Sequence, residues 1–430
     1  MQDKVAIIGA GGSAKSYVET SLGKDQSFDL FTTDGNGSIG DVKSIKIKDL
    51  DSSNYEKIII AIYRYNEVLK YFDESQRGKV FWYDNLKKSL SVIEDFFDEQ
   101  GDNFHKSEDT LCAIYDLRIA PPTYDFLNFL NICEIKREEK GLQWLKVLIA
   151  PGNQDGFRVD LIQKYGRENL DDRINNLLLP LVRFCNENAS VFYSKDREEC
   201  RRIYENSIYK YPETHDFAFP QPSHFYWEFF PYIEKGIEHR KLKSNPYYDK
   251  KISEWFEYNN LNPKKIVVFT IRENIAYTFR NTPIEEYRKL ASLLHLHGLQ
   301  VVLVRDTLTS HRKLCWDSVI ECNLAAMNIF YRQALYYNCL FNVMSSTGSV
   351  AINHLYAHSK FIIFGIYNQR QKASDLPHLE KTGTPKGQNR IGYGKGQFVS
   401  WVDETSEKMF QEIIKYCEEH LDFKINEANS

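Results

Sequence analysis

Short apolar runs alternate with helix-like stretches along the whole chain. The runs at 5–8, 266–269 and 301–304 are rich in β-branched residues and have the length of buried strands. Each run is followed by a stretch whose apolar residues recur at helical spacing. Strands that alternate with helices usually pair in parallel, with right-handed crossovers. The pattern therefore predicts an α/β protein built from parallel sheets.

The pattern also divides the chain into regions. We expect a small N-terminal Rossmann-like domain at 1–88, a charged helical linker at 89–108, and two Rossmann-like lobes at 109–245 and 246–430. The clearest strands are expected at 5–8, 29–32, 57–62, 80–83, 111–115, 146–150, 266–269, 301–304 and 361–364. The clearest helices are expected at 126–139 and 407–421. The segment from about 195 to 240 is aromatic and poorly periodic, so it carries no such prediction.

Composition excludes several classes of protein. The chain has 430 residues, of which 42% are hydrophobic and 27% charged, so two or three ordinary domains are expected rather than a disordered protein. Its formal net charge of −4 provides no basic excess for duplex DNA or RNA, so nucleic acid is not an expected partner.

The cysteine pattern and the apolar runs indicate a cytoplasmic location. Eight cysteines are scattered, without a C-x-x-C motif or a zinc-type spacing, which favours reduced, buried thiols. The N-terminus enters a strand at once and has no signal-peptide pattern. No apolar run reaches the roughly 20 residues that span a bilayer. We therefore expect a soluble protein of the cytoplasm.

The first strand ends in a glycine turn. Gly9, Gly11 and Ala14 form G-x-G-x-x-A between a strand and a helix, with Gly12 in the same turn. Such turns let a phosphate approach helix N–H groups, and Asp34 follows the second strand where a ribose-binding acid is expected. The turn therefore binds a nucleotide or only packs the helix against the strand, and both readings stay open.

The stretch from Ile7 to Gly12 resembles the N-terminal Rossmann-like module of bacterial sugar O- and N-acyltransferases. In that family the turn contacts a nucleotide-sugar substrate, and a histidine usually follows the double glycine. Ser13 stands at this position here. The hexapeptide repeats of the acyltransferase β-helix are missing, so the resemblance covers about one fifth of the chain and does not imply acetyl transfer.

Charged residues follow two strands of the third region. Arg272 and Glu273 come directly after the run at 266–269, Arg280 follows a few residues later, and Asp306 follows the run at 301–304. Ligands of open parallel sheets lie at these strand ends. The planar fork of arginine binds phosphate oxygens bidentately, so this edge suits a diphosphate. The alternative is a structural ion pair, for instance with Glu273.

A hydroxyl- and glycine-rich turn follows the next apolar segment. It consists of Ser345, Ser346, Thr347, Gly348 and Ser349, and it opens a helical stretch that contains Asn353. Hydroxyl groups, a permissive glycine and free N–H groups at a helix start suit a phosphate, although a plain helix cap has the same composition. Together with Arg272 at a neighbouring strand end, the turn predicts a site for a nucleotide diphosphate.

This order of strand, arginine, helix, strand and Ser/Gly turn resembles the donor-binding domain of GT-B glycosyltransferases, and in particular the heptosyltransferase-like and fucosyltransferase-like groups. The stretch from Tyr115 to Arg118, followed by Pro121 to Phe126, is similar to segments of bacterial surface-polysaccharide glycosyltransferases. The resemblance spans about 110–420. It implies a GT-B-like arrangement of the two lobes, with the donor in the C-terminal lobe and the acceptor in the other.

Inverting sugar transfer needs a general base for the acceptor hydroxyl. Asp116 is the first candidate and Asp155 the second. Asp116 could instead pair with Arg118, and Asp155 could only shape a turn. We expect Arg118 and Arg158 to contribute to binding, the latter through a donor or acceptor phosphate.

The chain shows no convincing metal motif. Asp49 and Asp51 form its only D-x-D, where a helix cap is the better interpretation, so no obligatory metal or other cofactor is expected. His215 and His224 lie in the aromatic segment and could act as base or acceptor contacts. Satisfied structural histidines are the more common outcome.

The sequence therefore predicts a glycosyltransferase that moves a sugar from a nucleotide-sugar donor to a glycan or glycolipid acceptor in bacterial surface-polysaccharide (capsule) synthesis. Peripheral contact with membrane-bound polysaccharide machinery and an oligomer are compatible with this function. One alternative is an NAD(P)-linked oxidoreductase that uses the turn at Gly9. The other is a non-catalytic, sugar-nucleotide-binding assembly protein.

Overall fold

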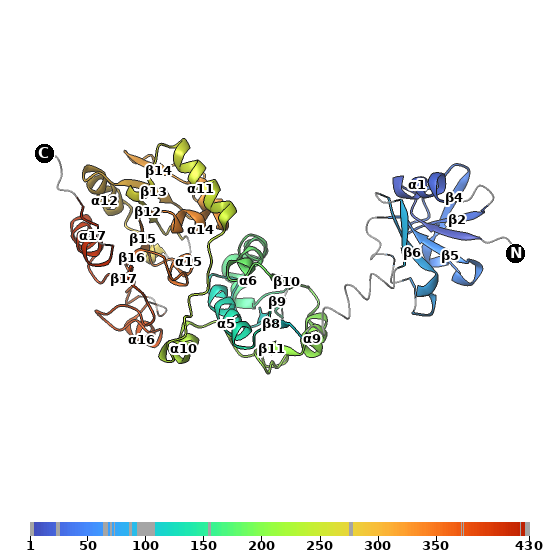
Figure 1. Ribbon diagram of the computed structural model, residues 1–430, viewed down its shortest axis with the longest axis horizontal. Helices are drawn as coiled ribbons and strands as arrows, with labels where there is room; N and C mark the ends of the chain where they lie inside the picture. Colours follow the sequence, from blue (N-terminus) through green and yellow to red (C-terminus); the bar gives the residue numbers. More distant parts are fainter. Residues whose placement is uncertain are drawn as a thin grey trace. The chain divides into compact units, whose positions relative to one another are not determined.

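The computed structural model divides the chain into two compact units, at 1–107 and 108–430. Each unit is an α/β fold, and each is described separately below (Figure 1). The residues described are 4–22, 26–62, 68, 71–72, 74–85, 88–92, 108–153, 156–274, 278–370, 372, 374–421 and 423–425.

The first unit is a single twisted sheet with strand order β3-β4-β2-β1-β5-β6-β7. Its elements are β1 (Val5–Ile8), α1 (Gly12–Thr20), β2 (Phe28–Thr32), β3 (Ser38–Ile39), β4 (Val42–Lys46), β5 (Lys57–Ile60), β6 (Val80–Asp84) and β7 (Ser89–Val92). The five central strands are parallel, and β3 and β7 are antiparallel edges. Apolar clusters cover both faces of the sheet.

The expected strands of the first unit are present. The hairpin of β3 and β4 was not predicted, since its strands are short and largely exposed. The prediction of a helical linker from residue 89 was wrong at its start, because 89–92 form β7, which pairs with β6. The alternating Ser-Leu-Ser-Val sequence suits an edge strand. The rest of the linker, 93–107, lies outside the described residues.

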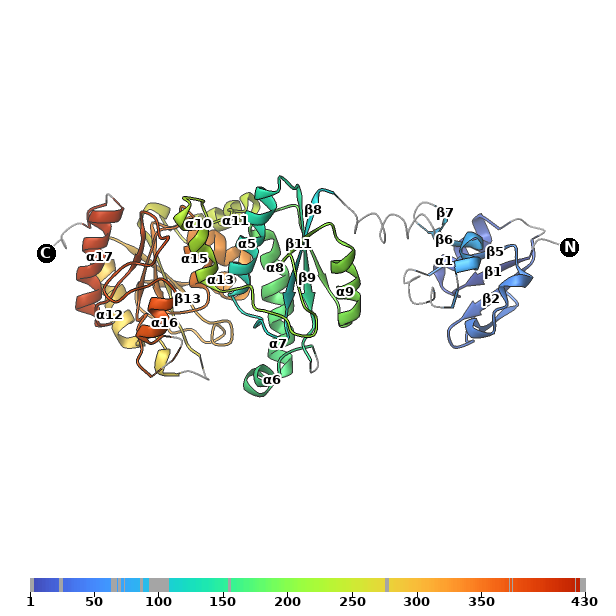
Figure 2. The same cartoon turned by 90° about the horizontal axis from the view of Figure 1, so that it is seen from below.

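The first lobe of the second unit has a parallel sheet of order β10-β9-β8-β11. Its elements are β8 (Thr110–Asp116), α5 (Phe126–Glu139), β9 (Trp144–Ala150), α6 (Val159–Tyr165), α7 (Arg167–Arg173), α8 (Leu179–Leu181), β10 (Ala189–Tyr193), α9 (Arg197–Asn206), β11 (Tyr209–Tyr211) and α10 (Phe230–Glu234). Helices α5 and α9 cover opposite faces of this sheet (Figure 2).

The second lobe has a six-stranded parallel sheet of order β14-β13-β12-β15-β16-β17. Its elements are α11 (Pro246–Tyr258), β12 (Ile266–Thr270), α12 (Ile284–Leu296), β13 (Gln300–Val304), β14 (Val319–Glu321), α13 (Asn323–Met327), α14 (Ile329–Tyr337), β15 (Phe341–Ser345), α15 (Val350–His354), β16 (Phe361–Phe364), α16 (Leu376–Lys381), β17 (Gln397–Val399) and α17 (Ser406–His420). This is the doubly wound Rossmann order, and it confirms the predicted α/β class.

Two apolar cores hold the second lobe together. Helices α12 and α17 pack on one face of its sheet. The other face, with α13 to α15, shares one continuous core with β8, β9 and α5 of the first lobe. Two Rossmann-like lobes joined in this way form a GT-B-like arrangement, so their adjoining strand ends can line a single site.

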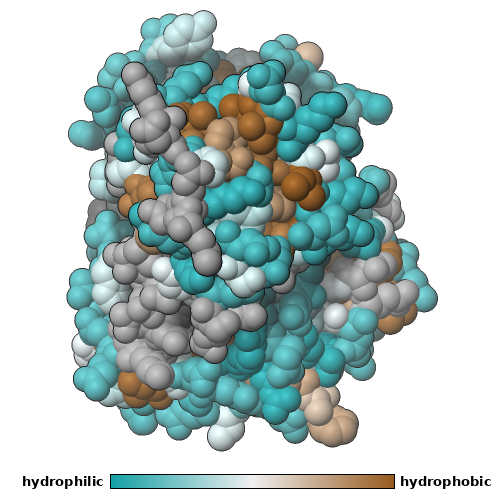
Figure 3. Space-filling model, turned by 90° about the vertical axis from the view of Figure 1, so that its right-hand side faces the viewer, coloured by the Kyte–Doolittle hydropathy of each residue, from teal (hydrophilic) through white to brown (hydrophobic). Residues whose placement is uncertain are grey.

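None of the helices in the described ranges is long and apolar enough to cross a membrane. The coloured part of the face in Figure 3 is mainly hydrophilic, with one hydrophobic area near the top of the view and smaller ones elsewhere. Scattered apolar groups of this kind are normal on a protein surface.

Candidate functional site

A cavity of about 1140 Å³ opens between the two lobes of the second unit. Arg272 and Glu273, after β12, line it together with the turn at 346–349, after β15. Strand order in this sheet reverses between β12 and β15, and ligands of open α/β sheets bind at the carboxyl ends of such strands. The first lobe contributes 123–125 and 224–227 to the opposite wall.

Two arginines of this cavity meet at one residue of the turn. Arg272 Nη1 donates to the carbonyl of Ser346 at 3.3 Å. Arg280 Nη2 donates to the same carbonyl at 3.2 Å and to Ser346 Oγ at 2.8 Å. Residues that are 74 positions apart in the chain thus converge at one point. The structure therefore brings together the three groups that the sequence assigned to a diphosphate, while their role in binding stays a prediction.

The other residues of the turn have different positions. Thr347 Oγ1 and Ser349 Oγ are hydrogen-bonded at 2.9 Å, and both residues line the cavity. A Cβ on Gly348 would lie 2.8 Å from Cδ2 of Tyr124, so glycine lets the turn approach the first lobe. Ser345 faces the core, where its Oγ lies 2.5 Å from Thr282 Oγ1.

Asn353 does not belong to the cavity lining. It is fully buried on α15, where its amide donates to Met344 Sδ and its Oδ1 accepts from Ser359 Oγ. Both bonds lie within the second lobe. Ser345 and Asn353 are both buried and lie outside the cavity lining.

The acidic residues predicted for the site, Glu273 and Asp306, line the same cavity and are hydrogen-bonded to each other. Glu273 accepts from Arg305 Nε at 2.8 Å and from Thr309 Oγ1 at 2.7 Å. Its backbone N–H donates to Asp306 Oδ2 at 2.7 Å. Burial raises the pKa of Asp306 above its ordinary value. Glu273 therefore neutralises Arg305, which the sequence analysis had not assigned to the site.

The cavity is lined by more cations than anions. Within the described part of the chain its lining contains seven arginines and four carboxylates. These are Arg173, Arg272, Arg280, Arg305, Arg312, Arg332 and Arg390, and Asp125, Asp172, Glu273 and Asp306. A confined site with this excess attracts anionic ligands.

Five of these arginines were not predicted from the sequence, and two of the five, Arg332 and Arg390, contact the first lobe. Arg332 is buried on α14, donates to the carbonyls of Ala325 at 2.8 Å and Arg305 at 3.3 Å, and approaches Tyr124. Arg390 lies 4.5 Å from the ring centre of Tyr226, a stacking that joins the two lobes. Arg390 belongs to a glycine-rich loop that the sequence could have identified. Arg332 lies inside a helix, and no sequence pattern around it indicates a binding site.

Several buried polar atoms around the cavity have no hydrogen-bond partner among the residues described. They include Asn128 Oδ1, His224 Nδ1, Arg305 Nη1, His354 Nε2 and Ser374 Oγ. An unsatisfied buried polar group costs about 1–3 kcal/mol, so such groups are rare and need a reason. Their concentration in one cavity suits a polar ligand.

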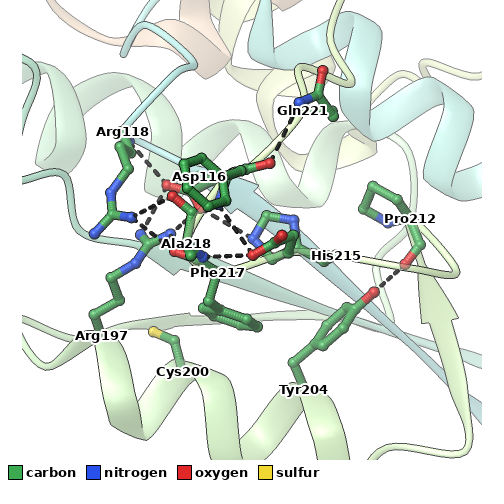
Figure 4. A network of polar contacts seen from close by, with 12 residues as sticks. Asp116, Arg118, Arg197, Cys200, Tyr204, Pro212, His215, Phe217, Ala218 and Gln221 are labelled. Atoms are coloured by element: carbon green, nitrogen blue, oxygen red, sulfur yellow. Dashed lines mark hydrogen bonds and ion pairs between the residues drawn. The ribbon is translucent and has the colours of Figure 1, made fainter.

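The corresponding edge of the first lobe is closed (Figure 4). Asp116, at the end of β8, accepts from Arg197 Nη1 at 2.9 Å and Nη2 at 2.5 Å, and His215 Nε2 lies 3.0 Å from its carboxylate. Arg118 and Arg197 also donate to the carbonyl of Phe217, at 2.8 and 3.0 Å. The segment around Phe217 is thus fastened across this sheet edge.

Asp116 is an internal anchor in this structure. Burial by itself would raise its pKa, but hydrogen bonds from His215 and Arg197 hold the pKa below its ordinary value. Its side chain is 2% exposed, and neither Asp116 nor Arg118 lines the cavity. The alternative pairing with Arg118 involves the Arg118 backbone N–H, at 2.9 Å, while the guanidinium partner is Arg197.

The remaining first-lobe candidates have different positions. Arg158 pairs with Asp160 at 2.6 Å and donates to the carbonyl of Ile119, outside the cavity lining. The prediction for Asp155 lies outside the described residues. Of the two histidines considered as base, His215 is part of the Asp116 network and His224 lines the cavity.

The N-terminal glycine turn combines close packing with open space. Gly9 has φ +110°, and a Cβ there would lie 2.5 Å from Ile62 Cγ2, so its glycine is required by packing. Nothing lies within 4 Å of a Cβ on Gly11 or Gly12. Asp34 is exposed, and its carboxylate accepts from the backbone N–H of Asn36 at 3.0 Å. Both interpretations of this turn remain.

Among the residues described, no group of three or more histidine, cysteine, aspartate or glutamate side chains could hold a metal ion. Asp51 caps a short helix, with its carboxylate accepting from the backbone N–H of Ser53 at 3.0 Å. This confirms the capping interpretation of the D-x-D pair.

No protein-family model and no curated protein matches the chain. It is similar to a solved family 9 glycosyl transferase from Veillonella parvula, at 8% identity, covering 60% of this chain and 81% of that one, with a TM-score of 0.35. It is similar to E. coli heptosyltransferase WaaC with ADP, at 12% identity, covering 73% and 100% of the two chains, with a TM-score of 0.34. For UDP-GlcNAc 2-epimerase from Methanocaldococcus jannaschii the identity is 10%, the coverage 98% and 94%, and the TM-score 0.28. Likenesses of this size do not assign an activity to the chain.

Proposed function

We propose that the chain is a glycosyltransferase that moves a sugar from a nucleotide-sugar donor to a glycan or glycolipid acceptor and releases the nucleotide diphosphate. The observation that carries this proposal is the convergence of Arg272 and Arg280 on Ser346 inside the interlobe cavity. Fixed cations at the point where a leaving group gains negative charge lower the barrier to its departure.

The donor fits the second lobe in a defined order. Its diphosphate lies against Arg272, Arg280 and the turn at 346–349. Its ribose lies at Asp306, because the acid that binds ribose in doubly wound sheets follows the strand next to the phosphate-binding one. Its base lies against Leu308 and Met327, two exposed apolar side chains of the cavity lining.

The first lobe holds the acceptor on the other side of the cavity. An acceptor hydroxyl attacks the anomeric carbon, its C–O bond forms, and the bond from that carbon to the diphosphate oxygen breaks with its electron pair. A single displacement of this kind inverts the anomeric configuration. The arginines provide the positive charge that a metal would otherwise supply, so the proposed reaction is metal-independent.

The biological setting that we propose is bacterial surface-polysaccharide synthesis in the cytoplasm, with the donor as substrate and no obligatory cofactor. The first unit serves there as a nucleotide-binding or docking module. The open space beside Gly11 and Gly12 is compatible with a phosphate, which keeps the NAD(P) alternative in view.

A thermal-shift panel tests the proposal. The full chain is incubated with UDP-, GDP-, ADP-, CMP- and dTDP-sugars, and separately with NAD and NADP. A ligand at 100 times its dissociation constant stabilises the folded state by about 2.7 kcal/mol, so one nucleotide class should raise the melting temperature clearly. Slow release of nucleotide from that donor should accompany the shift. Stabilisation by NAD or NADP alone would contradict the proposal.

A further inference from the structure

The first-lobe wall of the cavity carries two polar side chains that the donor does not use. Asn128 on α5 and His224 are 8% and 5% exposed, and both line the cavity. Asn128 Nδ2 donates to the carbonyl of His224 at 3.1 Å, which fixes the two residues to each other. Asn128 Oδ1 and His224 Nδ1 are buried and have no partner in the described residues.

The surroundings of His224 keep its ring in place and limit its charge. The ring packs against Phe225 and Tyr115, with centre distances of 4.5 and 6.0 Å. Burial lowers the pKa of His224, the carboxylate of Asp125 opposes this, and the charge of Arg158 adds to the lowering. The imidazole is therefore neutral near pH 7 and can accept a proton.

Other acids near the cavity are already engaged. Asp116 is held by Arg197 and His215 outside the cavity. Asp306 accepts from the backbone of Glu273 on the donor side. Asp172 accepts from Asn176 Nδ2 at 2.5 Å. On the acceptor wall this leaves His224 and the exposed Asp125, whose carboxylate accepts from Thr123 Oγ1 at 2.9 Å.

We propose that Asn128 and His224 form the subsite for the reacting hydroxyl group of the acceptor sugar, and that His224 takes its proton. The inference rests on the proposed glycosyl transfer and assigns its base. As the oxygen–carbon bond forms and the bond to the diphosphate breaks, the hydroxyl proton moves to the imidazole of His224. Asn128 Oδ1 accepts a hydrogen bond from the same sugar, and the Asp125 carboxylate stabilises the imidazolium.

Donor hydrolysis, with water as the acceptor, tests this assignment without knowledge of the natural acceptor. Wild type, His224→Gln, Asp125→Asn and Asn128→Ala are compared for nucleotide release from the sugar donor that stabilises the wild type. His224→Gln should lower the rate about 100-fold or more, since general-base contributions are about 10²–10⁴. Its dissociation constant for the nucleotide should stay within about 2-fold. Circular dichroism and melting temperature show that each variant is folded.

The pH dependence separates the base from its neighbour. The wild-type rate should fall as the pH drops below about 6.5, and this limb should vanish in His224→Gln but only shift to lower pH in Asp125→Asn. An unchanged rate and limb in His224→Gln, or loss of the limb in Asp125→Asn alone, overturns the assignment.

If the wild-type protein binds the donor without hydrolysing it, the protonation of His224 can be titrated directly by NMR. In ¹⁵N-histidine-labelled protein, the His224 signal, identified by its loss in His224→Gln, should report a neutral ring at pH 7. A protonated ring at that pH would overturn the assignment. A wild type that binds no nucleotide sugar would overturn the proposed function itself, and is thereby distinguished from failure of His224 alone.

Discussion

The two lobes of the second unit present the same strand order at their central edges, yet one edge is closed and the other open. In the first sheet β8 lies between β9 and β11, and in the second β12 lies between β13 and β15. Asp116, the last residue of β8, is bound by Arg197 and His215. Arg272 after β12 lines a cavity of about 1140 Å³.

The difference shows what topology decides and what side chains decide. Strand order creates a crevice at the carboxyl ends of both sheets. At the closed edge, guanidinium groups donate to the carbonyls of Phe217 and Ala218, so the chain itself fills the crevice. At the open edge, guanidinium groups converge on Ser346 beside the cavity. The side chain at the end of the central strand therefore decides the role of each edge: Asp116 at β8 anchors the chain, whereas Arg272 after β12 lines a cavity.

The largest effect is expected from a substitution at the closed edge of the first lobe. Asp116→Ala should lower the free energy of unfolding by about 3 kcal/mol, because it leaves the Arg197 guanidinium, which is 19% exposed, without its carboxylate partner. The matched control is Asp160→Ala, which removes an ion pair with a 61% exposed carboxylate and should cost about 1 kcal/mol or less. Urea unfolding measures both. Equal losses in the two variants would show that Asp116 is not an anchor.

Acid should weaken the fold in two pH windows. Burial lowers the pKa of His239, packed against Tyr226 at the cavity, to about 4. The unfolded chain takes up this proton near pH 6.5, so the stabilisation is complete above 6.5 and on the order of 3 kcal/mol is lost as the pH falls to 4. His239→Gln should remove this share of the loss, and the exposed control His295→Gln should leave it in place. Burial also lowers the pKa values of three other histidines, so part of the slope stays in His239→Gln. These are His224, His354 and His378.

The second window belongs to the closed edge. The pKa of Asp116 is held below its ordinary value of 3.8, so its contribution is present above 3.8 and is lost as the pH falls further. Asp116→Asn should reduce the dependence below 3.8, where Glu238 with a pKa of about 2 also contributes, and leave the one above it. Urea unfolding from pH 3 to 7 measures both windows. If the unfolding free energy changed equally with pH in His239→Gln and in the wild type between pH 4 and 6.5, His239 would not be the cause of this dependence.

At the open edge, Arg280→Ala should weaken binding of the nucleoside diphosphate by about 10- to 100-fold. Hydrogen bonds to charged groups contribute about 1.5–3 kcal/mol, and 1.4 kcal/mol corresponds to a factor of ten. Arg288→Ala is the control, because Arg288 pairs with Glu285 on the exposed side of α12. Isothermal titration calorimetry measures both affinities. Equal affinities would place the diphosphate elsewhere.

A smaller effect is expected where the open edge meets the first lobe. Gly348→Ala places a Cβ 2.8 Å from the ring of Tyr124, and overpacking of this kind costs about 1–3 kcal/mol. If that contact is the cause, Tyr124→Leu in the same chain should recover part of the loss, giving a non-additive double-mutant cycle in urea unfolding. Additive losses would mean that the two residues do not press on each other.

Most of the sheet framework could be predicted from the sequence, because its strands are short, buried and β-branched. Helix α5 begins and ends at the predicted residues, 126 and 139. Strand β11 carried no prediction, because it has three residues in an aromatic stretch and is recognisable only by its pairing with β8. The fold class followed from periodicity, whereas short edge strands depend on tertiary contacts.

The candidate site divides in the same way. Arg272, Arg280 and Ser346 follow strands, where parallel topology forces side chains together. Asn128 and Arg332 lie inside helices, and only the packing of the lobes turns them toward the cavity. Asp116 follows a strand too, and no sequence pattern shows that Arg197, 81 residues away, takes both of its oxygens.

A crystal structure of the full chain with a bound nucleoside diphosphate would locate the diphosphate directly. We expect its phosphate oxygens within hydrogen-bonding distance of Arg272, Arg280 and the turn at 346–349, with the base beside Leu308 and Met327. A diphosphate seated at Gly11 and Gly12 in the first unit, with the interlobe cavity unchanged, would contradict this expectation.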